Sequence, residues 1–273
     1  MKRIARRCIQ AIVANNVAWK IIGRPIAVLG NSLSFWRERH VTQRLAERFF
    51  ADGLIQSGLF AGLRYPRATG LGGAVYPRLL GTYENELHPA LRFMLSRKPE
   101  LIVDIGCAEG LYAVGLAYLL PHARVVAFDI NLEARAGCRE LAEINGIGNR
   151  LQISSKCTNA DLIELCCEQR ALVICDCEGF EEDLFDLGTA QALRQCDLII
   201  ELHDFIRAGV TSRIQRVFSP THHVELIRAV VTSEKVANYS GGPTWDALMP
   251  EQRTALIDEH RPALMQWLVA TAR

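Results

Sequence analysis

A glycine-containing turn in the middle of the chain has the residue types and spacing of a ligand site. Residues 101–103 form a short apolar run that suits a buried strand, and Asp104, Gly106 and Gly110 follow it. Residues 111–116 then continue with apolar side chains at helical spacing. Glycines let a backbone approach a bound molecule closely, and the N-terminus of a helix offers free N–H groups. The pattern predicts a strand, a ligand-binding turn and a helix.

The spacing of the glycines separates two classes of nucleoside-containing cofactor. A dinucleotide site has the pattern G-x-G-x-x-G, and its third glycine position, counted from Gly106, holds Leu111 in this chain. The pattern present is D-x-G-x-x-x-G. A second predicted strand, over 124–128, ends in Asp129, whose carboxylate can accept hydrogen bonds from both hydroxyls of a ribose. The spacing therefore favours a ribose-containing cofactor other than a dinucleotide.

Acidic side chains and one histidine follow two later apolar runs. Asp176 and Glu178 come directly after the first run, and Glu201 and His203 end the second. Because ligands of open α/β sheets bind outside the carboxyl ends of the strands, we expect these side chains near the glycine turn. His203 has an ordinary pKa near 6.5, which suits a general base, and strand alternation predicts that Glu201 points the same way. We predict a catalytic group of these four residues without a metal ion.

The same residues have two other interpretations. Glu178 or Glu181 could cap the helix expected from Phe180, because a carboxylate is stabilised at a helix N-terminus. Alternatively, the four residues could bind a divalent metal ion. Oxygen ligands with one imidazole suit magnesium or manganese better than zinc.

Two motifs resemble those of a known group of enzymes. The D-x-G-x-x-x-G turn resembles motif I of the class I S-adenosylmethionine-dependent methyltransferases. Residues 176–181 read D-C-E-G-F-E and resemble the D-x-E-G-x-E signature of the FkbM family of these enzymes. The sequence at 201–203 is similar to the E-x-H segment that follows the signature in that family. The resemblance covers about residues 81–205.

The resemblance implies O-methylation of a hydroxyl, often on a sugar or a secondary metabolite, with S-adenosylmethionine as the cofactor. The acceptor would be a small molecule or a glycan. Such an enzyme aligns acceptor oxygen, methyl carbon and sulfur, and removes the hydroxyl proton. The residues expected at the cofactor lie in the turn, after the second strand and before the first; they are Asp104, Gly106, Cys107, Gly110, Asp129, Ile130, Tyr83 and Glu84.

Other functions compete with this interpretation. The chain could be a non-catalytic binding or scaffold protein with a methyltransferase fold, or a divalent-metal-dependent small-molecule O-methyltransferase. A nucleic-acid methyltransferase often carries a [D/N]-P-P-[Y/F] tetrad or a strongly basic face, and neither occurs outside 1–37. The formal net charge is +1, and we expect no nucleic-acid partner.

The elements around these motifs predict an α/β fold. We expect a Rossmann-like class I methyltransferase fold with a mostly parallel, doubly wound sheet, an N-terminal helical extension and a C-terminal helix. The predicted parts are a helical extension with a glycine-rich loop over 1–80, a cofactor-binding domain over 81–232 and a C-terminal helical tail over 233–273. The elements expected in addition are strands at 150–155 and 223–231, a helix to about 97 capped by Thr82, a glycine-rich loop over 57–82 and a mostly helical segment over 244–273.

The N-terminal region and the cysteines bear on location. Residues 1–37 hold seven basic side chains and no acidic one, and 3–22 has the periodicity of an amphipathic helix, with a second helix expected over 32–56. Residues 1–24 could contact an anionic membrane surface, or the helix could pack on the domain. No apolar run reaches 18 residues. The nine cysteines include no C-x-x-C pair and are expected as free thiols of a cytoplasmic protein.

Overall fold

The computed structural model describes residues 49–66 and 74–273. The chain forms two compact units, 1–51 and 52–273, and the second unit holds every element discussed below. The predicted helix over 3–22, most of the helix over 32–56 and part of the glycine-rich loop lie outside the described residues. Among the helices that are described, none is both long enough and apolar enough to span a membrane. The eight described cysteines are all free thiols.

A seven-stranded sheet with the order β3-β2-β1-β4-β5-β7-β6 forms the centre of this unit. All neighbours pair in parallel except β7, which is antiparallel to both β5 and β6. The predicted α/β class with a mostly parallel sheet is confirmed. The strands are β1 Leu101–Ile105, β2 Arg124–Phe128, β3 Leu151–Ser154, β4 Ala171–Cys175, β5 Asp197–Glu201, β6 His222–Arg228 and β7 Gln266–Ala272.

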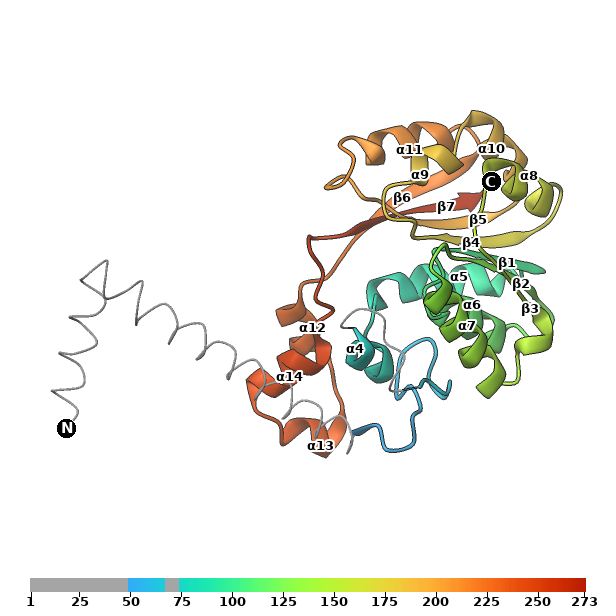
Figure 1. Cartoon of the computed structure of the whole chain (residues 1–273). Coiled ribbons are helices and arrows are strands. Elements are labelled where there is room, and N and C mark those ends of the chain that lie inside the picture. Colours follow the sequence, from blue (N-terminus) through green and yellow to red (C-terminus); the bar gives the residue numbers. More distant parts are fainter. Residues whose placement is uncertain (1–48, 67–73) are drawn as a thin grey trace, which may run out of the picture. The chain divides into compact units, whose positions relative to one another are not determined.

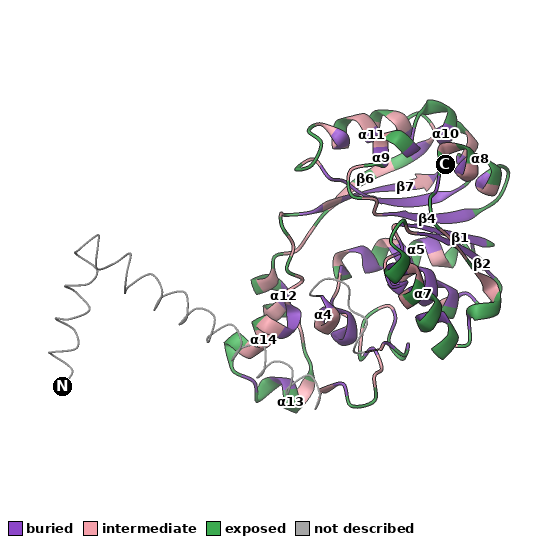
Figure 2. Cartoon of the chain, viewed as in Figure 1, coloured by how far each residue is buried: buried purple, intermediate pink, exposed green. Residues whose placement is uncertain are grey.

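Helices cover both faces of the sheet, as expected for a doubly wound arrangement (Figure 1). On one face lie α5 His88–Ser96, α6 Leu111–Leu119 and α7 Leu132–Ile144. On the other lie α8 Asn159–Cys166, α9 Glu181–Leu184, α10 Leu187–Ala192 and α11 Val210–Phe218. The central strands β1, β4 and β5 are buried along their whole length, as Figure 2 shows by colour. Their sequences are mostly apolar, without alternation, as burial on both faces requires.

Strand register places the chemistry-bearing residues at one edge of the sheet. Ile105 pairs with Cys175, and Cys175 pairs with Ile200. The residues that come next in each strand or turn, Gly106, Asp176 and Glu201, therefore lie side by side at the carboxyl ends of β1, β4 and β5. This is the place where ligands of open α/β sheets bind.

The prediction of a mostly helical C-terminal segment is wrong for its last part. Helices α13 Gly242–Asp246 and α14 Pro250–Ile257 are present, but Gln266–Ala272 forms β7 between β5 and β6. Four consecutive residues of β7, Trp267–Ala270, are buried. A short apolar run buried on both faces has no alternation, so periodicity alone does not distinguish it from a buried helix.

The region before β1 also differs from the predictions. Val75–Leu80 forms the short helix α4 within the segment predicted as loop, and Gly81 closes it in the left-handed conformation. Thr82 does not cap the next helix; η2 Asn85–Leu87 and then α5 follow, and α5 has Leu87 at its N-cap. Glu84 interrupts the helical path because its φ is +47°. Helix α14 packs against α4 and against α12 Thr232–Asn238.

Candidate functional site

The turn after β1 is held in a conformation that only glycine fits well. Gly106 has a φ of +79°, and a Cβ atom there would lie 1.6 Å from the carbonyl oxygen of Asp176. Gly110 has a φ of +93° and forms the N-cap of α6, where a Cβ would lie 2.7 Å from Cys138 Sγ. The backbone N–H of Cys107 donates to the carbonyl of Phe128 at 3.0 Å. The turn is therefore pressed between the loop after β4 and helix α7.

Two predicted cofactor residues accept hydrogen bonds from backbone N–H groups of the turn and of the helix that follows it. Asp104 is buried, and its Oδ2 accepts a hydrogen bond from the N–H of Ala113 in α6 at 2.8 Å. Asp129 Oδ2 accepts from the N–H of Ala108 at 2.9 Å, so the end of β2 is tied to the turn. Asp129 is only half-buried, and Ile130 beside it is 81% exposed. Asp129 Oδ1 also accepts the N–H of Asn131 at 2.8 Å, so that the carboxylate is fixed beside the turn and next to an exposed apolar side chain.

Burial, with a smaller contribution from the charges of Asp176 and Asp129, raises the pKa of Asp104 to about 7, although the hydrogen bond from Ala113 acts in the opposite direction. The folded state therefore binds a proton that the unfolded state has already released above about pH 4. This contribution to stability is present below about pH 4 and is lost as the pH rises to about 7, at about 1.4 kcal/mol per pH unit. The Asp104→Asn variant cannot lose this contribution. Its free energy of unfolding should therefore increase relative to that of the parent as the pH rises. Urea unfolding of the parent and the variant at pH 5 and pH 7 measures this change. A difference in free energy of unfolding that is the same at both pH values would contradict the prediction.

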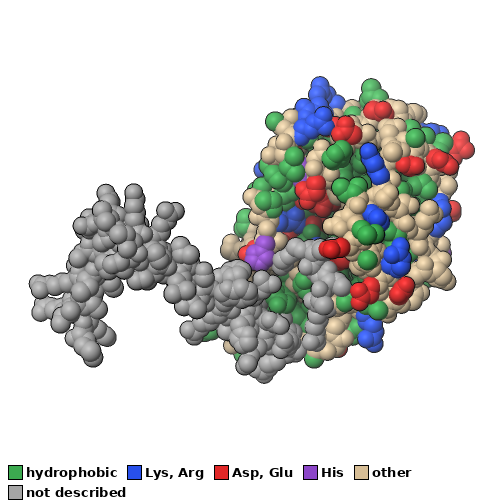
Figure 3. Space-filling model, in the orientation of Figure 1, with side chains coloured by type: hydrophobic (Ala, Val, Ile, Leu, Met, Phe, Trp, Pro, Cys, Tyr) green, Lys and Arg blue, Asp and Glu red, His purple; other side chains and the backbone are tan. Residues whose placement is uncertain are grey.

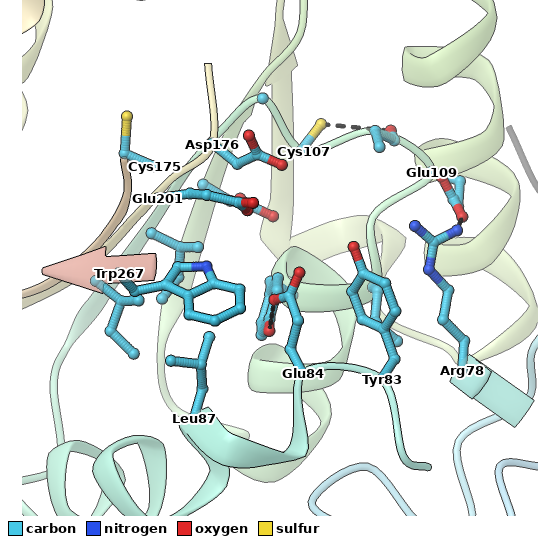
Figure 4. A pocket seen from close by; sticks show the side chains of 17 residues that line it. Arg78, Tyr83, Glu84, Leu87, Cys107, Glu109, Cys175, Asp176, Glu201 and Trp267 are labelled. Atoms are coloured by element: carbon cyan, nitrogen blue, oxygen red, sulfur yellow. Dashed lines mark hydrogen bonds and ion pairs between the residues drawn. The ribbon is translucent and has the colours of Figure 1, made fainter. Parts of the chain in front are cut away.

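A cavity of about 50 Å³ lies beneath the turn and is rich in carboxyl groups (Figure 4). The predicted residues Tyr83, Glu84, Asp104, Gly106 and Cys107 all line it. Figure 4 shows the carboxyl groups of Asp176, Glu201 and Glu84 on one side, near the Trp267 indole, and the Arg78–Glu109 pair on the other. The acidic and basic side chains of the lining are five carboxyl groups and one guanidinium, from Glu84, Asp104, Glu109, Asp176, Glu201 and Arg78.

Arg261, which the sequence patterns did not single out, binds the carboxylates of this cavity from outside its lining. Its Nη2 donates to Glu84 Oε1 at 2.6 Å and its Nη1 to Glu201 Oε1 at 3.1 Å. Its Nε donates to Glu259 Oε2 at 2.6 Å. Glu84 also accepts a hydrogen bond from the Tyr112 hydroxyl. One guanidinium thus fixes carboxylates from three separate segments of the chain.

A second cluster surrounds the buried imidazole of His203, whose side chain is only 1% exposed. Its Nδ1 lies 2.6 Å from Glu181 Oε1, a hydrogen bond between two buried side chains. Its Nε2 lies 3.4 Å from Asp176 Oδ1 and 3.5 Å from Glu178 Oε2. Asp176 lies in both places, since it also lines the cavity. We call Asp176, Glu178, Glu181 and His203 the histidine cluster.

The structure brings Asp176, Glu178 and His203 together, whereas Glu201 lines the cavity with Asp176 and is bound by Arg261. Strand β5 ends at Glu201, so the alternation that would align Glu201 with His203 does not continue. Glu201 binds Arg261, and Glu181 instead holds the imidazole. For the capping interpretation, the N-cap residue of α9 makes no side-chain hydrogen bond, but Glu181 lies in the first turn and accepts the N–H of Gly179 at 3.1 Å. Position 181 belongs to the D-x-E-G-x-E sequence, and that signal could have placed it among the site residues.

The protonation of His203 follows from its surroundings. Burial lowers its pKa, but the hydrogen bond to Glu181 and the negative charges of Asp176, Glu181 and Glu178 raise it more, so that the net shift is upward. An imidazole with a raised pKa is more often charged at neutral pH and is then unable to accept a proton. Three surrounding carboxylates therefore make His203 a weaker general base than its ordinary pKa suggests.

Exposed apolar side chains adjoin the histidine cluster. Phe180, Phe205 and Ile206 are each at least half-exposed. The ring of Phe205 lies 5.7 Å from that of His203, centroid to centroid, and a Cβ on Gly179 would meet Ile206 at 3.0 Å. Large exposed apolar groups gathered around polar ones are typical of a binding surface.

Comparisons with known proteins give structural likenesses only. No family model matches the chain, and no curated protein matches it in sequence. The chain is similar to the precorrin-6y C5,15-methyltransferase of Geobacter metallireducens GS-15, with 10% identity over 68% of this chain and 89% of that one and a TM-score of 0.43. It is similar to the O-methyltransferase TomG of Streptomyces achromogenes in complex with SAM, with 13% identity over 68% and 80% and a TM-score of 0.44. It is similar to the SAH-bound methyltransferase PaMTH1 of Podospora anserina, with 19% identity over 55% and 74% and a TM-score of 0.41.

Proposed function

We propose that the chain is an S-adenosylmethionine-dependent methyltransferase of the FkbM type, acting on a hydroxyl of a sugar or a secondary metabolite. The observation that carries the proposal is the excess of carboxyl groups around the turn after β1. Five carboxyl groups and one guanidinium line the cavity. A pyrophosphate would be repelled by this lining, whereas a positively charged sulfonium and ammonium would be attracted. Charge and glycine spacing therefore favour the same cofactor class.

The residues present fit this cofactor. When bound, S-adenosylmethionine supplies an electrophilic methyl group on a positively charged sulfur. The Asp129 carboxylate at the end of β2 can accept hydrogen bonds from ribose hydroxyls, and Ile130 offers an exposed apolar surface to the base. Glu84, Asp176 and Glu201 place carboxyl groups in the cavity, and Arg261 binds those of Glu84 and Glu201.

The histidine cluster is the proposed place for the acceptor hydroxyl. Asp176 belongs to both the cavity and the cluster, so a hydroxyl bound beside it would be next to the cofactor. The exposed Phe180, Phe205 and Ile206 would contact an apolar part of the acceptor, which supports a secondary metabolite. On the face seen in Figure 3, Lys and Arg side chains of the described residues are interspersed with Asp and Glu, which supports a small-molecule acceptor rather than a nucleic acid.

Titration of the protein with S-adenosylhomocysteine, the demethylated cofactor, tests the proposal. Calorimetry should detect binding by the parent chain. Asp129→Asn should weaken it by about 1–3 kcal/mol, or roughly 5–150-fold, because a ribose hydroxyl loses a charged acceptor. Failure of the parent to bind either S-adenosylmethionine or S-adenosylhomocysteine would overturn the proposal.

A matched control separates loss of affinity from loss of stability. Asp161 also accepts a backbone N–H, that of Thr158 at 2.8 Å, but it does so at the start of α8, outside the residues that line the cavity. Asp161→Asn should lower the melting temperature through a weaker helix cap and leave the affinity for S-adenosylhomocysteine unchanged. Equal losses of affinity in both variants would remove Asp129 from the ribose site.

A further inference from the structure

The histidine cluster places two carboxylate oxygens against one nitrogen of a buried imidazole. Glu181 accepts a hydrogen bond from His203 Nδ1, so that Nε2 is the nitrogen that faces the other two carboxylates. Asp176 Oδ1 and Glu178 Oε2 approach Nε2. Asp176 Oδ1 is out of contact with solvent and has no hydrogen-bond partner among the described residues. Such an arrangement favours positive charge at its centre.

A proton on Nε2 would form poor hydrogen bonds with the two facing carboxylate oxygens. The two oxygens lie 3.4 and 3.5 Å from Nε2, whereas good N–H···O hydrogen bonds have a separation of 2.7–3.2 Å. An imidazolium would therefore bond well to neither carboxylate. A larger cation between the three atoms would interact with all of them at once.

The spacing suits a metal ion. The three ligand atoms lie within 4.8 Å of one another. Around an octahedral ion with ligands at about 2.1 Å, neighbouring ligand atoms are about 3 Å apart, so small side-chain shifts would complete the geometry. Glu178 is largely exposed and Asp176 partly so, which leaves the remaining coordination positions open to water or substrate.

Glu181 gives the cluster the outer support that metal-binding histidines usually have. Its side chain is fully buried, and its Oε1 accepts from both His203 and the N–H of Gly179. A carboxylate on the far nitrogen fixes the tautomer and the orientation of the ring and makes the facing nitrogen a better ligand. The buried pair is thus prearranged to present Nε2 to an ion.

We infer that Asp176, Glu178 and His203 form a binding site for one divalent cation of the manganese type. Two carboxylates favour a hard ion, and the imidazole makes Mn²⁺ a better fit than Mg²⁺. The existence of the site is inferred from its geometry, whereas its role in methyl transfer rests on the proposed function. Beside the cavity, the ion would bind the acceptor oxygen and lower the pKa of its hydroxyl, so that the proton leaves to solvent as the oxygen takes the methyl group from sulfur. It would thereby replace His203 as the means of activating the hydroxyl.

Binding of Mn²⁺ to the full chain without cofactor tests the site. Calorimetry and electron paramagnetic resonance should show one bound Mn²⁺ per chain, and the pulsed spectrum should contain the coupling of one imidazole nitrogen. Asp176→Asn and Glu178→Gln should each weaken binding, the first by more than about 100-fold, and Glu181→Gln by about 10–100-fold. The nitrogen coupling should disappear in His203→Gln.

Asp183→Asn is the matched control. This carboxylate lies in the same segment but is exposed and pairs with Arg207, so its loss should leave Mn²⁺ affinity unchanged. Absence of Mn²⁺ binding, or binding that survives both Asp176→Asn and Glu178→Gln, would overturn the inference. Because S-adenosylhomocysteine binding is measured separately without metal, a failed metal site and a failed cofactor site give different results.

Discussion

Replacing Gly106 by alanine should lower the free energy of unfolding by about 2–5 kcal/mol. The residue has a left-handed φ of +79°, which costs a side-chain-bearing residue about 1–2 kcal/mol. In addition, the new Cβ would lie 1.6 Å from the carbonyl oxygen of Asp176, so the backbone after β4 must move. Overpacking of this kind typically costs a further 1–3 kcal/mol. Urea unfolding followed by circular dichroism measures the sum.

Gly146→Ala provides the control for this prediction. Gly146 has a similar φ of +70°, but a Cβ there would have no neighbour within 4 Å. Its substitution should therefore cost only the left-handed term, about 1–2 kcal/mol. Because Gly106→Ala displaces Asp176, it should also impair binding of S-adenosylhomocysteine, which Gly146→Ala should not. Equal destabilisation by both substitutions would show that the contact with Asp176 is unimportant.

Arg261→Met should destabilise the fold by about 3–5 kcal/mol at neutral pH. The substitution keeps an apolar stem of similar length but leaves the buried carboxylates of Glu84 and Glu201 without their cation. Uncompensated buried charge is the costly outcome of breaking such a pair. Burial raises the pKa of Glu201 well above its usual value, and the charges of Asp176 and Glu84 raise it further. The deficit should therefore grow as the pH rises and shrink as it falls, because a protonated Glu201 leaves no charge uncompensated; urea unfolding across the pH range measures it.

Arg207→Met is the comparison for Arg261. Arg207 also pairs with two carboxylates, Glu182 and Asp183, but its side chain is 48% exposed. Solvent screens such pairs, and we expect a loss of no more than about 1 kcal/mol. If the two variants were equally stable, or if the deficit of Arg261→Met did not depend on pH, the buried pairs would not hold the cavity together.

The sequence was informative where one segment alone determines the structure. The apolar runs of β1, β4 and β5 and the glycines of the turn act locally, and register then places Asp176 beside the turn. Every predicted cofactor residue lies in the turn, at the end of β2 or in the cavity lining. The D-x-E-G-x-E sequence pointed to residues that meet at His203.

Sequence patterns failed where distant segments decide the outcome. Arg261 has no local pattern, and its importance comes from contacts with Glu84 and Glu201, which precede it by many residues. The pairing of Glu181 with His203 likewise depends on where β5 ends. Residues 266–272 form the strand β7 because they lie between β5 and β6, and the periodicity of 266–272 does not indicate this position.

The position of β7 has a consequence for how the chain is made. Strands β1 to β5 can assemble as soon as the ribosome has released them, but β6 has no direct place beside β5. The edge of β5 stays unpaired until Gln266–Ala272 has been synthesised, and an unpaired strand edge can pair with other chains and aggregate. Arg261 and Trp267, which complete the cavity and its surroundings, arrive in the same late step. A nascent chain should therefore gain protection from aggregation and a finished ligand site together, so that a chaperone acting on β5 would also delay ligand binding.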